Sequence, residues 1–120
     1  MSWLRRRIAE VQVAFMLLTR LPAGRLEGVA PELSTAKWAF PLAGLVVGGS
    51  LAGVYIAMDS LGLPAELAAI LALGAGMMMT GGLHEDGLAD CADGFGSGQT
   101  KDQKLAIMKD SRVGSYGVLV

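Results

Sequence analysis

The sequence has little of several residue types, and each shortage excludes a class of protein. It contains one cysteine, Cys91, so no disulfide can form within the chain, which fits a reducing compartment. Aromatic residues make up only 6% of the chain. They do not alternate with the basic residues, so the sequence gives no sign of a surface on which nucleic-acid bases stack, and we expect no nucleic-acid partner.

Charged residues are also few, at 18% of the chain, whereas 52% of the residues are hydrophobic. No charged residue occurs between positions 38 and 58. At about 1.5 Å per residue, a helix of this length just crosses a hydrocarbon core of roughly 30 Å. A second apolar run, at 65–83, contains only Glu66, close to its start, where a helix favours an anion. The sequence therefore predicts two transmembrane helices, at 38–58 and 65–83.

Residues 1–21 place apolar side chains at steps of three to four residues, which predicts an amphipathic helix at the membrane interface. A secretory signal peptide also begins with arginine, but its cleavage site needs small residues, and here Thr19-Arg20-Leu21-Pro22 follows the apolar stretch. At the other end, residues 115–120 resemble the start of a third span. We expect an all-α fold, a polytopic integral membrane helix bundle of which this chain is the truncated N-terminal part of one domain.

The basic residues predict the orientation of the two spans. Six precede the first span and four follow the second, and the hairpin between the spans has none: Arg5, Arg6, Arg7, Arg20, Arg25 and Lys37, then Lys101, Lys104, Lys109 and Arg112. By the positive-inside rule, both polar segments face the cytoplasm. The segment 84–114 is then a cytoplasmic segment next to the membrane.

Acidic residues gather in this segment, whose first part reads GGLHEDGLADCADGFGSG from Gly81 to Gly98. On a helix, Asp86, Asp90 and Asp93 project from one face within roughly 60°. Crowded carboxylates need a cation, and aspartate oxygens suit Mg²⁺ or Mn²⁺ better than Zn²⁺. The other reading is a solvated acidic turn after a membrane helix.

Basic residues follow on the same side of the membrane. Lys109 and Arg112 would bind a phosphate group, or they would bind anionic lipid as juxtamembrane cations. His84 would act as a general base or metal ligand, and the alternative is a histidine that packs and forms hydrogen bonds. The glycine-rich stretch from Gly94 to Gly98 is expected to be a flexible loop, after which Thr100 and Gln103 predict a capping box that starts a short helix.

Three segments in this order resemble the cobalamin synthase family, the adenosylcobinamide-GDP ribazoletransferases. They are FMLLTRLP at 15–22, GGLHEDGLADCADG at 81–94 and IMKDSRVGSYG at 107–117. The resemblance implies an inner-membrane enzyme of bacteria with its active site facing the cytoplasm. It also implies a Mg²⁺-dependent reaction in which α-ribazole, or its 5′-phosphate, attacks adenosylcobinamide-GDP and releases GMP.

The family's acidic motif maps onto Asp86, Asp90 and Asp93, with Glu85 as a further metal ligand that we do not expect to be essential. Its basic motif maps onto Lys109, Asp110, Ser111 and Arg112, which gives Ser111 a part in phosphate binding. The proton acceptor would be His84 or one of the aspartates. Association with a second copy or with other cobalamin-synthesis enzymes is a further expectation.

Other functions remain open from the sequence. A lipid synthase similar to the CDP-alcohol phosphotransferases would use a comparable acidic site, although their Ala-Arg pair after the second acid is missing here. A divalent-cation transporter would place the acids along a permeation path. A non-catalytic membrane subunit would use its glycine faces for assembly and would tolerate loss of the aspartates.

Overall fold

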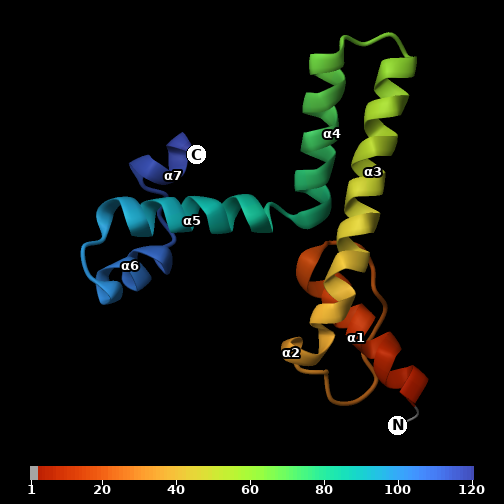
Figure 1. Ribbon diagram of the computed structural model, residues 1–120, viewed down its shortest axis with the longest axis horizontal. Coiled ribbons are helices and arrows are strands. Elements are labelled where there is room, and N and C mark those ends of the chain that lie inside the picture. Colours follow the sequence, from red (N-terminus) through yellow and green to blue (C-terminus); the bar gives the residue numbers. More distant parts are fainter. Residues whose placement is uncertain (1–2) are drawn as a thin grey trace. The chain divides into compact units, whose positions relative to one another are not determined.

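The computed structural model describes residues 3–120, and within that range the chain folds into helices without a strand (Figure 1). It divides into two compact units, Met1–Gly81 and Gly82–Val120. The helical class predicted from the sequence is therefore confirmed. The arrangement of a complete bundle stays a prediction.

The first unit begins with α1, Trp3–Leu18. This is the predicted amphipathic helix, of which residues 1 and 2 lie outside the described range. The helix ends because the Thr19 hydroxyl donates to the Phe15 carbonyl oxygen at 2.8 Å and accepts from the Leu21 backbone N–H at 3.2 Å. The next residue, Arg20, donates its backbone N–H to the carbonyl oxygen of Met79 at 2.7 Å, which joins the end of α1 to the end of α4, Ala65–Thr80.

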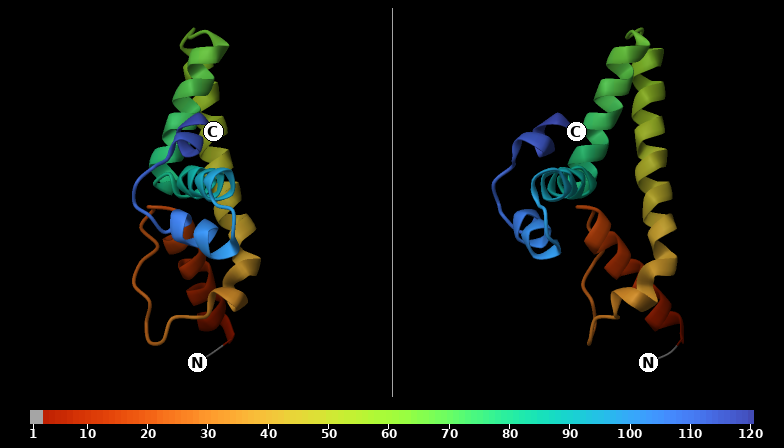
Figure 2. Two further views of the ribbon diagram at one scale, coloured as in Figure 1. Left: turned by 90° about the vertical axis from the view of Figure 1, so that its left-hand side faces the viewer. Right: turned by 60° about the vertical axis from the view of Figure 1, so that its left-hand side comes forward.

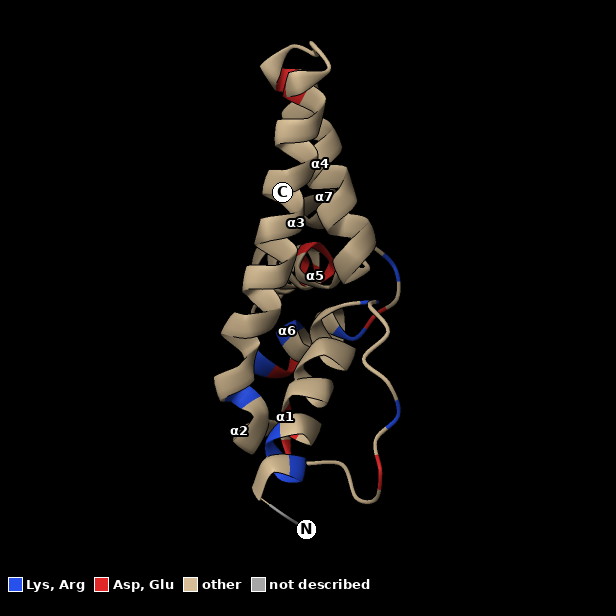
Figure 3. Cartoon of the chain, turned by 90° about the vertical axis from the view of Figure 1, so that its right-hand side faces the viewer, with Lys and Arg blue, Asp and Glu red and all other residues tan. Residues whose placement is uncertain are grey.

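A connector leads to three consecutive helical segments: α2, Leu33–Ala36, η1, Lys37–Ala39, and α3, Phe40–Ser60. Together they form a stretch of 28 residues from Leu33 to Ser60, which is long and apolar enough to cross a membrane. Within residues 3–120 it is the single unbroken helix with this property. Figure 3 shows the hairpin of α3 and α4 without charge over most of its length.

Helices α3 and α4 lie side by side, joined by a turn in which Gly62 takes the left-handed conformation (Figures 1 and 2). Small residues of α4 make the contact, because Ala68, Ala72 and Gly76 are its buried positions. A Cβ on Gly76 would lie 2.8 Å from a methyl carbon of Leu51. The glycines of α3 take no part in this contact, since a Cβ at Gly44, Gly48, Gly49 or Gly53 would meet no atom within 4 Å.

The predicted second span ends earlier than expected, because α4 stops at Thr80 and not at residue 83. Gly81 and Gly82 both have a left-handed φ, of 70° and 71°, which a helix cannot continue through. Sixteen residues of helix span about 24 Å, less than a hydrocarbon core of roughly 30 Å. Helix α4 is long enough for a membrane span only if α5, Leu83–Ser97, is counted with it, and the chain is broken between the two helices.

The second unit consists of α5, α6 (Lys101–Met108) and α7 (Ser115–Leu119), with both short helices in contact with α5. The glycine-rich stretch at 94–98 is not a loop, because α5 continues through it to Ser97. A Cβ on Gly94 would lie 2.7 Å from Met108 of α6, and one on Gly96 would lie 2.5 Å from the Tyr116 ring of α7. These glycines therefore serve close packing of helices. The capping box of Thr100 and Gln103 at the start of α6 is confirmed.

Candidate functional site

The acidic segment is helical, and α5 presents its first acids at its N-terminus. Glu85 and Asp86 lie in the first turn, where the unpaired N–H groups of a helix favour negative charge. His84, Glu85 and Asp86 are all exposed. Nothing in the first turn restricts these side chains, so they remain available to a ligand.

Asp86 and Asp90 lie one turn apart on the same face of α5, as the spacing predicts. Asp86 is exposed and Asp90 is half-buried. Among residues 3–120, neither carboxylate has a hydrogen bond or an ion pair, and no three His, Cys, Asp or Glu side chains come together as a metal site. The chain therefore offers a pair of carboxylates with open oxygens. A Mg²⁺ ion commonly uses one or two carboxylates together with substrate phosphates and water, so this pair fits such an ion.

Asp93 differs from these two residues, because it is buried, with 5% of its surface exposed. Its Oδ2 accepts the backbone N–H of Gly114 at 2.6 Å, and its Oδ1 accepts that of Gly117 at 2.8 Å. Gly114 is the N-cap residue of α7 and has no side chain with which to cap the helix. The Asp93 carboxylate performs this function from α5. We call this contact of Asp93 with Gly114 and Gly117 the Asp93 clamp.

The predicted phosphate-binding residues lie in the loop between α6 and α7, just before the Asp93 clamp. Lys109, Ser111 and Arg112 are exposed. Asp110 accepts three hydrogen bonds from Arg112: its Oδ1 accepts the backbone N–H at 3.0 Å and Nε–H at 3.1 Å, and its Oδ2 accepts an Nη2 proton at 2.7 Å. These hydrogen bonds lower the pKa of Asp110 to about 2 and raise that of Arg112. The loop therefore carries an ion pair at neutral pH. A phosphate group that binds Arg112 would meet a guanidinium that is already paired with Asp110.

Sequence reasoning missed two sets of residues. One is the glycine pair of the Asp93 clamp, for which the only local signal was two glycines three residues apart at a helix start. The other is Glu10, a fully buried carboxylate that accepts hydrogen bonds from Trp38 at 2.7 Å, Arg7 at 2.8 Å and Arg6 at 3.2 Å. Its signal was an acid three and four residues after two arginines.

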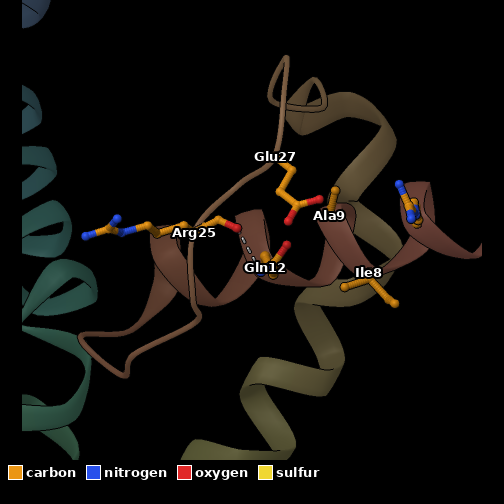
Figure 4. Close-up of a pocket in the computed structure, with 6 residues that line it drawn as sticks. Ile8, Ala9, Gln12, Arg25 and Glu27 are labelled. Carbon is orange, nitrogen blue, oxygen red and sulfur yellow. Dashed lines mark hydrogen bonds between the residues drawn. The ribbon is translucent and has the colours of Figure 1, made fainter. Parts of the chain in front are cut away.

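The first unit contains a cavity of about 370 Å³ between α1 and the connector that follows it (Figure 4). The residues that line it are Arg5, Ile8, Ala9, Gln12, Arg25 and Glu27. The Gln12 side chain closes one part of it by donating to the carbonyl oxygens of Ala23, at 2.9 Å, and Arg25, at 3.5 Å. None of the predicted site residues belongs to this cavity. In the second unit, a shallow and open depression borders Val113, Gly114, Ser115, Val118 and Leu119, next to the Asp93 clamp.

Comparison with known proteins gives a consistent result over almost the whole chain. The family model described as cobalamin-5-phosphate synthase matches residues 10–120. An adenosylcobinamide-GDP ribazoletransferase of Bradyrhizobium diazoefficiens is 49% identical over 116 residues, which cover 96% of this chain and 45% of the relative. The proteins of the same name from Azorhizobium caulinodans and Shewanella frigidimarina are 47% and 46% identical, and they cover 93% and 98% of this chain.

The chain spans about half the length of the curated relatives it matches, since it covers 44% of the Azorhizobium protein and 45% of the Shewanella protein. No solved structure matches the chain. The matched region includes α5, the loop between α6 and α7, and the Asp93 clamp.

Proposed function

Because this chain belongs to the cobalamin-5-phosphate synthase family, we propose that it is the N-terminal half of a membrane enzyme that transfers the phosphocobinamide group of adenosylcobinamide-GDP to α-ribazole, or to its 5′-phosphate, and releases GMP. The printed names of the relatives support this substrate pair. The enzyme would cross the bacterial inner membrane several times, with α5 on the cytoplasmic side. The apolar stretch from Leu33 to Ser60 supports a membrane location.

The proposal rests on the two kinds of charged group that the second unit contains. Helix α5 presents two carboxylates without partners, Asp86 and Asp90, and the same helix binds the segment that directly follows the basic loop. A phosphoryl transfer needs both kinds of group, since anionic oxygens must be neutralised on the diphosphate and on the leaving phosphate. Glu85, which is exposed in the first turn, belongs to the expected ligand set as well. Asp93, which the sequence also predicts as a ligand, is buried and already accepts two backbone N–H groups.

In this proposal Asp86 and Asp90 would hold Mg²⁺, which when bound neutralises charge on the diphosphate. Lys109, Ser111 and Arg112 would bind phosphate oxygens from the loop. The 5′-hydroxyl oxygen of α-ribazole forms a bond to the phosphorus attached to cobinamide. The bond between that phosphorus and the oxygen that leaves with GMP breaks.

The hydroxyl proton must pass to a base on the chain. His84 is exposed at the start of α5, one residue from the acids, and is our first candidate. An aspartate of the pair is the second. The test between them is the pH profile of the rate in His84→Ala. This variant loses the parent's fall in rate on the acid side only if the imidazole takes the proton, because a protonated imidazole cannot accept another.

The proposal is tested with the full-length enzyme in membranes supplied with adenosylcobinamide-GDP, α-ribazole and Mg²⁺. We expect GMP release that chelation abolishes and that Asp86→Asn lowers by roughly 100-fold or more, because a bound metal supplies several kcal/mol of charge stabilisation. Asp59→Asn is the matched control: it removes an exposed aspartate in the last turn of α3, far along the chain from the site, and should leave the rate unchanged.

Equal GMP release from the parent and Asp86→Asn would remove the acidic pair from the reaction. No release from either protein would contradict the transferase itself. Metal uptake by sealed vesicles, measured without nucleotide, would then test the cation-transport alternative.

A further inference from the structure

We propose that Asp93 is a positioning residue, which holds the basic loop Lys109–Val113 against α5 through the Asp93 clamp and does not act as a third metal ligand. The inference rests on the proposed function for the role of that loop in phosphate binding. The clamp itself is a property of the second unit alone.

The first argument is the geometry of the carboxylate. Each oxygen of Asp93 accepts one backbone N–H, at 2.6 and 2.8 Å, and the residue is 5% exposed. The acceptor of both hydrogen bonds is a carboxylate, which makes them stronger than hydrogen bonds between neutral groups. A Mg²⁺ ion usually keeps several waters, which need open space around the ligand. Asp86 and Asp90 offer such space, and Asp93 does not.

The second argument is the pair of glycines on the other side of the contact. Gly114 has a φ of −93°, which any residue adopts, so its backbone conformation does not require glycine. A Cβ at Gly114 would collide with the Asp93 carboxylate, and one at Gly117 would lie 2.5 Å from Oδ2. Glycine within a helix costs about 1 kcal/mol relative to alanine. Its presence at position 117 is explained by the room that the carboxylate needs.

The third argument is where the clamp lies along the chain. A single residue, Val113, separates Arg112 from Gly114. The other end of the loop leaves α6 at Met108, which packs against Gly94 of α5. Both ends of the basic loop are therefore fixed on α5 at neighbouring positions, 93 and 94. Asp90 and Asp86 precede Asp93 on this helix by about 4.5 and 10.5 Å along its axis. The clamp thus sets the distance between the acidic pair and the cations.

The kinetic test separates positioning from metal binding in the full-length enzyme. For Asp93→Asn we expect the KM for adenosylcobinamide-GDP to rise about 10-fold or more, because hydrogen bonds to a charged acceptor are lost, while the Mg²⁺ concentration for half-maximal rate stays that of the parent. Asp86→Asn should shift the Mg²⁺ dependence. A shift of that dependence in Asp93→Asn, as large as in Asp86→Asn, would overturn the inference.

Gly117→Ala is the second variant, because it removes no carboxylate from the chain and disturbs the clamp from the α7 side. Positioning predicts that it also raises the KM for the GDP-linked substrate and leaves the Mg²⁺ dependence of the parent unchanged. A metal-ligand role for Asp93 predicts that the Mg²⁺ dependence shifts, because the alanine methyl group would displace the Asp93 carboxylate. Gly87→Ala is the matched control: this glycine also lies within a helix, on α5, but a Cβ there would meet no atom within 4 Å.

A measurement on the full-length enzyme in detergent, made without substrates, keeps this inference separate from the proposed function. In hydrogen exchange followed by NMR, the amide protons of Gly114 and Gly117 should be protected in the parent and exchange at least about 10-fold faster in Asp93→Ala. Unprotected amides in the parent would contradict the clamp, whatever the enzyme assay gives. Protected amides together with an enzyme that releases no GMP would leave the clamp intact and refute the proposed function.

Discussion

Glu10 shows how a single residue joins two elements of the first unit. Its carboxylate is fully buried and accepts the indole N–H of Trp38 in η1 together with protons of Arg7 and Arg6 in α1. The Arg7 guanidinium also lies over the rings of Trp3, at 5.7 Å, and Trp38, at 5.4 Å. A carboxylate at the interface of α1 and η1 is therefore satisfied completely, as a buried charge must be.

These partners, the Trp38 hydrogen bond first, lower the pKa of Glu10 below its ordinary value of 4.5. A carboxyl whose pKa is lower in the folded state stabilises that state above pH 4.5, and the contribution is lost as the pH falls through the lowered pKa. We therefore expect the α1–η1 contact to be independent of pH from 5 to 8 and to open under more acidic conditions. Tryptophan fluorescence of the chain in detergent would follow this opening.

The variant Glu10→Gln should move that fluorescence toward the acid form already at neutral pH, because the amide cannot pair with two arginines. Glu27→Gln is the control, since Glu27 is exposed and makes no contact with the tryptophans. An unchanged spectrum in Glu10→Gln would show that the buried carboxylate does not hold the contact together.

At the scale of elements, the α3–α4 hairpin depends on which glycines face the partner helix. Gly76 lies against Leu51, whereas a Cβ on Gly74, two residues earlier on the same helix, would meet no atom within 4 Å. We expect Gly76→Val to destabilise the hairpin by about 1–3 kcal/mol through overpacking, and Gly74→Val to cost clearly less. Denaturant unfolding of the two variants in detergent measures the difference. Equal stabilities would contradict the packing of Leu51 on Gly76.

The elements that the sequence predicted well are those specified by neighbouring residues. The capping box at Thr100 and Gln103 is local, and Pro64 stands at the N-cap of α4, next to the predicted helix start. The uncharged run at 38–58 lies within the helical stretch to Ser60. The acidic segment is helical, which is the condition under which its aspartates were expected to share a face.

The errors arose where tertiary contacts decided the outcome. Glycine is a poor helix former, yet Gly94 and Gly96 lie within α5 because Met108 and Tyr116 pack on them, and neither contact is visible from the local sequence. The partners of Asp93 are 21 and 24 residues away. A carboxylate bound by backbone amides and one available to a metal look alike in a sequence. The metal roles of Asp86, Asp90 and Glu85 stay predictions, and for Asp93 we propose the positioning role in place of the predicted metal role.

At the scale of the whole molecule, the orientation in the membrane decides whether the candidate site meets its substrates. All ten basic residues lie before the α3–α4 hairpin or after it, and the loop within the hairpin has none. Such an asymmetry predicts that both flanking segments lie on the cytoplasmic side.

Cys91 provides a direct test, because it is the single cysteine of the chain and is exposed on α5, between Asp90 and Asp93. An impermeant thiol reagent should label the 120-residue chain in inside-out vesicles and leave it unlabelled in right-side-out vesicles. The double variant Cys91→Ser, Asp59→Cys is the matched control, since its cysteine lies at the end of α3 and should show the opposite pattern. Labelling of Cys91 from the outside would place the acidic pair away from cytoplasmic substrates, and the transferase would then need a different site.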